Sequence, residues 1–146
     1  MPFYRRNLSS ILLVSLLALS ACDMPSTDRT ELDATLTAAS EVPPIESKAS
    51  GEADVHIDVK SNKLSWDIKY SDLSGVATGA HFHGPAMVGA NADVAVPISG
   101  DLSSPIKGEA TITAAQAAEV LEGKWYINLH TAAHPDGEIR GQVVAE

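Results

Sequence analysis

The sequence has only one cysteine among its 146 residues, so no disulfide can form within the chain. Basic residues are also scarce: the sequence has ten lysines and arginines but nineteen aspartates and glutamates, and its formal net charge is −9. A chain this acidic would repel the phosphates of DNA or RNA, so we expect no nucleic-acid partner. An apolar core must therefore stabilise the fold, and a bound metal ion is the other feature that could stabilise it.

Motifs of several catalytic classes are missing. The sequence contains no Gly-x-Ser-x-Gly element, no glycine-rich phosphate loop, and no serine beside the histidines described below. Asp136 and Glu138 follow His134 closely, but two carboxylates at a turn are typical of solvated charges or of partners for a base such as Arg140. Enzymatic activity is therefore the least supported class of function, and we assign no catalytic residue.

No apolar run is long enough to span a membrane, but the N-terminus has the three parts of an export signal. Residues 1–7 carry two arginines, residues 8–18 are apolar, and small residues precede Cys22. This arrangement resembles the bacterial lipoprotein signal, in which the cysteine is lipidated and becomes the new N-terminus. We expect a signal peptide over 1–21 and a palmitate-type anchor on Cys22. The lipoprotein would then face the periplasm or cell exterior of the bacterial cell envelope, held to the membrane by its lipid.

Residues 22–31 are polar and lack apolar periodicity, which predicts a flexible tether before a single domain over 32–146. Apolar and polar residues then alternate in short runs separated by turn signals. One helix is expected over 114–122, between a Thr113–Gln116 capping box and Gly123. Besides the first histidine segment, strands are expected over 32–39, 51–60, 64–71, 93–98, 106–112, 124–131 and 139–144.

Short strands at regular intervals with one helix indicate an all-β fold, which we predict to be an antiparallel, Greek-key-like β-sandwich. Alternate side chains of each strand should face the interior. The predicted core contains Val55, Ile57, Trp66, Ile68, Phe82, Ile127 and Leu129.

Four of the five histidines lie in two short segments, 80–85 and 128–135. His81 and His83 are two residues apart, so on a strand their side chains point to one side and Phe82 points to the other. Two imidazoles about 6 to 7 Å apart along one strand face can converge on a single ion. The fifth histidine, His56, alternates with aspartates and is expected to be an ordinary solvated strand residue.

The second segment offers further ligands. His130 leaves its strand on the polar side together with Asn128, and His134 lies in the turn that follows. If the two histidine strands are neighbours, His81, His83 and His130 form one metal site, with His134 as a candidate fourth ligand. Nitrogen ligands without cysteine suit copper, or zinc as the alternative, whereas calcium would need carboxylates. The other interpretation is that the histidines only hydrogen-bond loops to the sheet.

Four segments of the sequence form a set of motifs that occur in this order: Glu41-Val42-Pro43-Pro44, Ala80-His81-Phe82-His83-Gly84-Pro85, Tyr126-Ile127-Asn128-Leu129-His130-Thr131 and Gly137-Glu138-Ile139-Arg140-Gly141-Gln142. Together they resemble one family, the CHRD domain named for its occurrence in chordin, and the resemblance extends over about residues 32–144. It implies an immunoglobulin-like or superoxide-dismutase-like β-sandwich in an exported protein, often as a single copy on a bacterial lipoprotein. It implies no defined biochemical activity.

A second resemblance concerns the order of the histidines. Copper/zinc superoxide dismutases also carry a His-x-His on a strand, a later histidine and an arginine near the C-terminal end, as His81, His83, His130 and Arg140 do here. The zinc-binding loop and the disulfide of that family are absent. The resemblance therefore implies at most a mononuclear copper site, with Asn128 and Arg140 as supporting residues.

Three functions stay open at this point. The first is a metal-binding module, most plausibly for copper. The second is a structural or adhesive interaction domain without metal, in which the histidines anchor loops and Arg140 pairs with an acid. The third, ranked last, is a dismutase-like copper oxidoreductase. The sequence names no protein partner.

Overall fold

The computed structural model describes residues 29–145. The expected signal peptide, the lipidated Cys22 and most of the expected tether lie outside these residues. No helix within 29–145 has the length and apolar character needed to cross a membrane.

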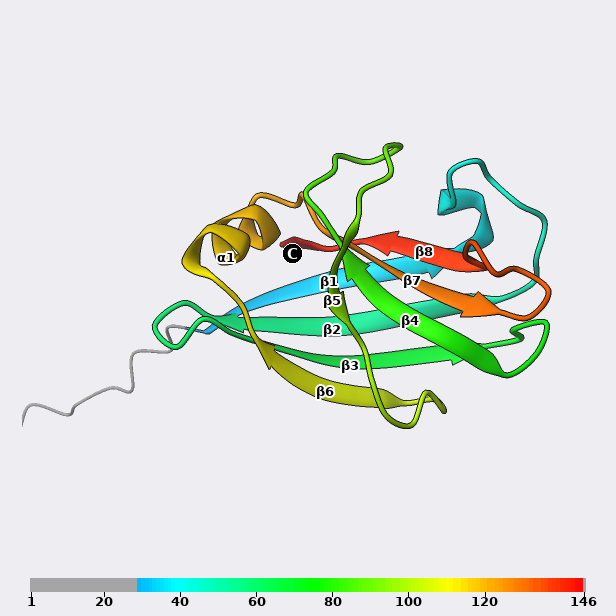
Figure 1. Cartoon of the computed structure of the whole chain (residues 1–146), viewed down its shortest axis with the longest axis horizontal. Helices are drawn as coiled ribbons and strands as arrows, with labels where there is room; N and C mark the ends of the chain where they lie inside the picture. Colours follow the sequence, from blue (N-terminus) through cyan, green and yellow to red (C-terminus); the bar gives the residue numbers. More distant parts are fainter. Residues whose placement is uncertain (1–28, 146) are drawn as a thin grey trace, which may run out of the picture.

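The fold is a nine-stranded sheet in which every pair of neighbouring strands is antiparallel. The order of strands along it is β5-β4-β7-β8-β1-β2-β3-β6, and β9 pairs with β1 (Figure 1). The elements are β1 (Arg29–Thr37), the 3-10 helix η1 (Ala38–Ser40), β2 (Ser50–Asp58), β3 (Lys63–Ser71), β4 (Ala77–His83), β5 (Val94–Pro97), β6 (Ile106–Thr111), α1 (Ala114–Leu121), β7 (Tyr126–Thr131), β8 (Ile139–Gln142) and β9 (Val144–Ala145).

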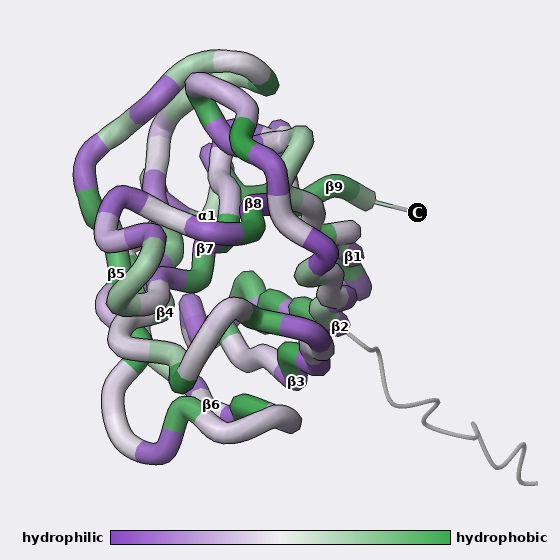
Figure 2. Tube along the Cα trace, turned by 90° about the vertical axis from the view of Figure 1, so that its right-hand side faces the viewer, coloured by the Kyte–Doolittle hydropathy of each residue, from purple (hydrophilic) through white to green (hydrophobic). Residues whose placement is uncertain are grey.

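The alternation of residues builds the β1–β2–β3 meander as expected. Val55 and Ile57 face the interior and are paired with Trp66 and Leu64 of β3, while the residues between them point outward. Figure 2 views these strands nearly end-on and shows both green and purple residues on them. The hairpin turns at Asn62, whose φ of 53° lies in the left-handed region that asparagine tolerates.

The sheet curls until its two halves face each other. Four strands lie between β3 and β4 along the sheet, yet the ring centroids of Trp66 of β3 and Phe82 of β4 lie 5.2 Å apart. The ring centroid of Trp125 lies 6.4 Å from that of Phe82. All seven predicted core residues are buried. The antiparallel all-β class with one short helix is confirmed; the strands form one nearly closed sheet, and the two-sheet, Greek-key-like arrangement stays a prediction.

The helix forms where its capping residues predict. The Thr113 hydroxyl accepts from the Gln116 backbone, the Gln116 side chain accepts from the Thr113 backbone, and Gly123 follows the helix with φ of 70°. Its buried Val120 joins the core, so the helix covers one end of the curled sheet.

Several boundaries shift by one or two residues, and two larger differences from the prediction have a clear cause. β1 begins at Arg29, three residues before the expected start of the domain, because residues 29–31 pair with β2 despite their polarity. The last strand, expected over 139–144, is divided at the buried Val143, whose N–H donates to the Trp125 carbonyl instead of to a neighbouring strand. Neither difference moves a candidate site residue.

Candidate metal centre

The strand β4 presents two histidines on one face. Its buried residues, Ala80 and Phe82, alternate with the half-buried His81 and His83. The same-side placement that the two-residue spacing predicts is therefore confirmed. Gly84 ends the strand at a point where a Cβ would overlap the Trp125 ring, so the core aromatic fixes how the chain leaves the histidine segment.

Strand pairing brings the third histidine to the same place. β4 and β7 are neighbours, with His81 opposite Asn128 and Gly79 opposite His130. Because Gly79 has no side chain, the rings of His81 and His130 occupy the space above it. A Cβ at Gly79 would lie 3.3 Å from Cε1 of His81 and 3.4 Å from Cδ2 of His130.

The three imidazoles form one compact cluster. Nδ1 of His81 lies 3.0 Å from Nε2 of His130, and one ring nitrogen from each of His81, His83 and His130 lies within 4.8 Å of the others. Two nitrogens bound tetrahedrally to one Zn²⁺ at about 2.0–2.1 Å would be about 3.3 Å apart. The His81–His130 pair is already near that separation, and the remaining distances need only small side-chain movements to close.

Backbone carbonyls orient two of the rings. Nδ1 of His130 donates to the Pro135 carbonyl at 2.9 Å, and Nδ1 of His83 donates to the Ala92 carbonyl at 3.0 Å. Metal-binding histidines almost always donate their second ring N–H in this way, which fixes the tautomer and leaves Nε2 for the metal. Nε2 of a neutral His130 is thereby left to accept a hydrogen bond from Nδ1 of His81.

Asn128 and Arg140, the two expected supporting residues, both act through His83. A neutral His83 can donate from only one nitrogen, through Nδ1 to the Ala92 carbonyl or through Nε2 to the amide oxygen of Asn128, both at 3.0 Å. A metal at Nε2 requires the first arrangement and displaces the Asn128 contact. The Tyr126 ring stacks parallel to His83 at 4.8 Å, and the Arg140 guanidinium lies 3.4 Å from the centre of the same tyrosine ring. Since β7 lies between β4 and β8, the three side chains form a stack across three neighbouring strands.

The electrostatics of the cluster favour neutral rings. Burial lowers the pKa of His81, and the neighbouring His130 and His83 lower it further. Burial also lowers the pKa of His130, partly offset by its hydrogen bond to the Pro135 carbonyl. Neutral imidazole is the form that binds a metal, so these shifts keep both ligands available at mildly acidic pH.

The other two histidines lie apart. His134 is not among the residues whose nitrogens meet, because its backbone N–H and carbonyl both pair with Thr131 and fold it into a tight turn beyond the end of β7. His56 is half-buried rather than fully solvated, and its Nδ1 is buried without a hydrogen-bond partner. The structure thus gathers three of the four predicted ligands.

The interpretation of Glu138 as a solvated charge or an Arg140 partner is wrong. Its side chain is 0% exposed and accepts hydrogen bonds from Ser47, Ser74 and Thr131. Burial raises the pKa of Glu138, but these hydrogen bonds outweigh it and hold the pKa at about 2. Periodicity places Glu138 at the start of a strand but cannot show which loops close over it.

Within residues 29–145, Arg140 does not form the expected ion pair with an acid. It is 2% exposed, and its guanidinium donates to the Asn91 side chain at 2.8 Å and to the Ala90 carbonyl at 2.6 Å. Tyr126, which the sequence analysis names only as part of a motif, links Arg140 to His83.

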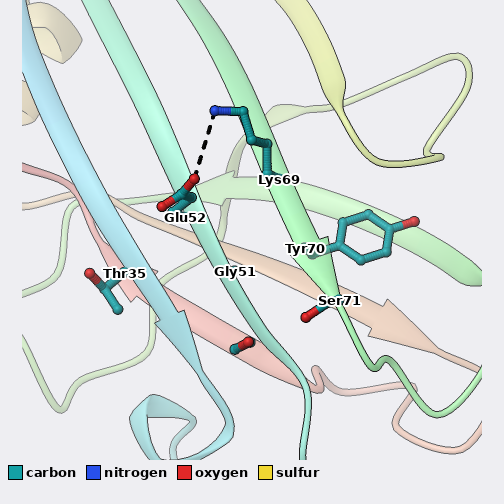
Figure 3. Close-up of a pocket in the computed structure, with 7 residues that line it drawn as sticks. Thr35, Gly51, Glu52, Lys69, Tyr70 and Ser71 are labelled. Atoms are coloured by element: carbon teal, nitrogen blue, oxygen red, sulfur yellow. Dashed lines mark ion pairs between the residues drawn. The ribbon is translucent and has the colours of Figure 1, made fainter.

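An open hollow on the solvent side of β1–β3 contains no histidine (Figure 3). It has a volume of about 360 Å³ and is lined in part by Glu52 and Lys69. Lys69 pairs with Glu52 and with Asp54, both at 3.7 Å, so its charge is already compensated. We assign this hollow no chemistry.

Comparison with known proteins agrees with the motifs in the sequence. The family model of the CHRD domain matches residues 32–143, which is well over half of the chain and includes all three clustered histidines. No curated protein and no solved structure is matched. The protein belongs to the CHRD domain family.

Proposed function

We propose that the protein binds one transition-metal ion through His81, His83 and His130, with copper as the favoured metal and zinc as the alternative. The observation that carries this proposal is the approach of three imidazole nitrogens to within 4.8 Å from two neighbouring strands. The carbonyls of Pro135 and Ala92 orient two of the rings as metal ligands are oriented.

The ligand chemistry supports the choice of metal. Imidazole suits copper and zinc, and for nitrogen sites the affinity of divalent first-row metals peaks at Cu²⁺. Three protein ligands leave one coordination position open, as in catalytic rather than purely structural zinc sites. A water molecule or a small ligand would complete the coordination, and the site would serve metal handling in the cell envelope.

The proposal includes export and lipid attachment at Cys22. It rests on the charged, apolar and small-residue parts of residues 1–21. Replacing Cys22 with serine should abolish labelling of the protein by a palmitate analogue in cells, while Met24→Ser should leave it intact. Continued labelling of the cysteine variant would show that Cys22 does not carry the lipid.

A second function, a structural or interaction module without metal, is favoured by a different observation. Each clustered histidine has a hydrogen-bond partner within the protein: His81 with His130, His130 with Pro135, and His83 with Ala92 or Asn128. Such a network would tie the loops after β4 and β7 to the sheet. A dismutase-like reaction ranks last, because Arg140 is buried against Tyr126 and already hydrogen-bonded.

Calorimetric titration of Cu(II) and Zn(II) into protein purified without a histidine tag separates these functions. Wild-type protein should bind one ion, and His83→Ala should bind it at least about tenfold more weakly. His56→Ala is the matched control, because His56 lies outside the cluster, and it should bind as the wild type does. Wild-type protein that takes up neither ion would leave the structural module as the function.

A further inference from the structure

A second cavity is lined by residues of two sequence motifs that contain none of the clustered histidines. It has a volume of about 440 Å³ and lies between the 39–44 segment, the 88–89 loop and β8. Glu41, Val42 and Pro44 of the Glu-Val-Pro-Pro motif line one side, and Arg140 and Gln142 line another. The volume falls in the range of small-molecule binding sites.

The chemistry of this cavity centres on a buried carboxyl group. Glu41 is 7% exposed, its Oε1 has no hydrogen-bond partner, and none of the ion pairs found within residues 29–145 includes it. Burial raises the pKa of Glu41 to about 7, against the opposing effects of Arg140 and Asn128. A buried carboxylate without a close counter-ion is costly, so a ligand that brought one would be strongly favoured.

The position of Glu41 is enforced by its surroundings. A Cβ at Gly137 would lie 2.6 Å from Oε1 of Glu41 and 2.6 Å from Nδ2 of Asn128. Only glycine, here with φ of 133°, lets the carboxyl group and the amide lie side by side against the backbone. The space beside Gly137 therefore sets the position of the Glu41 carboxyl group.

The same cavity is poorly suited to an anion. Both terminal nitrogens of Arg140 already donate to residues of the 90–91 segment, and the guanidinium lies on the Tyr126 ring. These contacts hold the guanidinium against the 90–91 segment, while the Glu41 carboxylate would repel an anionic ligand. The net charge of −9 would also attract cations toward the molecule.

We propose that this cavity binds a small organic cation, an amine with an apolar body, whose ammonium group pairs with Glu41. The apolar body lies against Val42, Pro44 and Val88, and Val88 is 77% exposed when the cavity is empty. A charge-assisted hydrogen bond supplies specificity, and the covered apolar surface supplies affinity. None of the three clustered histidines lines this cavity.

The test uses 2-phenylethylamine as the probe and 2-phenylethanol as its neutral counterpart of similar shape. Each is titrated into the purified ¹⁵N-labelled protein and followed by amide shifts in NMR spectra. The amine should cause saturable shifts at Ser40, Val42 and Gly89, with an affinity about tenfold higher than that of the alcohol. Glu41→Gln should remove this preference, whereas Glu46→Gln, at an exposed position outside the cavity lining, should keep it.

A second variant keeps the test valid if Glu41→Gln perturbs the fold. Val88→Arg lies on an exposed loop, and it should weaken amine binding by placing a competing cation at the cavity. The proposal is overturned if the amine causes no shifts in these residues, if amine and alcohol bind equally, or if folded Glu41→Gln keeps the preference for the amine.

Discussion

Nδ1 of His81 and Nε2 of His130 lie 3.0 Å apart across the antiparallel pair of β4 and β7. Because Nδ1 of His130 donates to the Pro135 carbonyl, Nε2 of a neutral His130 must accept, and the shared proton belongs to His81. A metal ion at this point would replace that proton. The contact therefore links two residues that are 49 positions apart in the sequence into the centre of the proposed site.

Metal affinity should persist to lower pH than free imidazole would allow. The pKa values of His81 and His130 are lowered, mainly by burial, so both rings stay neutral as the pH falls below 6.5. The binding constant should decline only at a pH below 6.5. Titrations between pH 4.5 and 8 would show this, and a decline that begins above 6.5 would contradict the shifts.

Gly79→Ala should weaken metal binding with little loss of stability. The added Cβ would lie 3.3 Å from Cε1 of His81 and 3.4 Å from Cδ2 of His130, so at least one ring must move from its position. We expect a several-fold increase in the dissociation constant for Cu(II), measured by competition with a chelator. Gly75→Ala is the control, since its Cβ would meet nothing within 4 Å. Equal affinities of the two variants would mean that ring placement does not limit binding.

Part of this site was predictable from the sequence and part was not. The two-residue spacing of His81 and His83 fixes their common face once the segment is a strand. The pairing of β7 with β4 joins strands that are distant in the sequence, and hydrophobic periodicity cannot predict it. Neither spacing nor composition indicates that the turn after β7 directs His134 away from the cluster.

Buried polar residues were the least predictable. Glu138 and Arg140 have the local sequence of surface charges, and only the folded chain shows the hydroxyl groups and the Tyr126 ring that surround them. The apolar core was predictable because the alternation of apolar and polar residues shows which side chains face the interior. Val55, Ile57 and their partners are buried whichever strand lies opposite. The curling of the sheet into one nearly closed layer depends on its twist and pairing order, which alternation does not encode.

Trp66→Ala should destabilise the protein by about 3 to 5 kcal/mol, because it removes a buried ring that packs on Phe82 and leaves a cavity between the two halves of the sheet. The loss is comparable to the whole stability of many small domains. Urea unfolding measures it, with Val76→Ala at an exposed position as the control. An unchanged midpoint for Trp66→Ala would show that this ring does not hold the halves together.

Glu138→Gln should cost about 2 to 4 kcal/mol of stability at neutral pH, since an amide cannot replace both carboxylate oxygens as acceptors for Ser47, Ser74 and Thr131. The pKa of Glu138 is about 2 in the folded protein against an ordinary 4.5, so the unfolded chain binds the proton more tightly. The carboxylate therefore contributes its full stability above pH 4.5 and loses it as the pH falls through about 2.

Urea unfolding of wild type and Glu138→Gln at several pH values checks this sign. The difference in unfolding free energy should be constant above pH 4.5 and shrink below it. Glu41, with its raised pKa of about 7, acts in the opposite direction between pH 4.5 and 7, but it is present in both proteins and cancels. A difference that grows on acidification would refute the role given to Glu138.

X-ray absorption at the metal edge of the loaded protein tests the metal site most directly, because it counts the imidazole ligands and measures their distances. Zinc-loaded wild-type protein should show three imidazole nitrogens at about 2.0–2.1 Å and one further, non-imidazole ligand. His130→Ala should reduce the imidazole count by one, and His56→Ala should leave it at three. A zinc ion bound with fewer than three imidazoles in the wild type would contradict a site built from His81, His83 and His130.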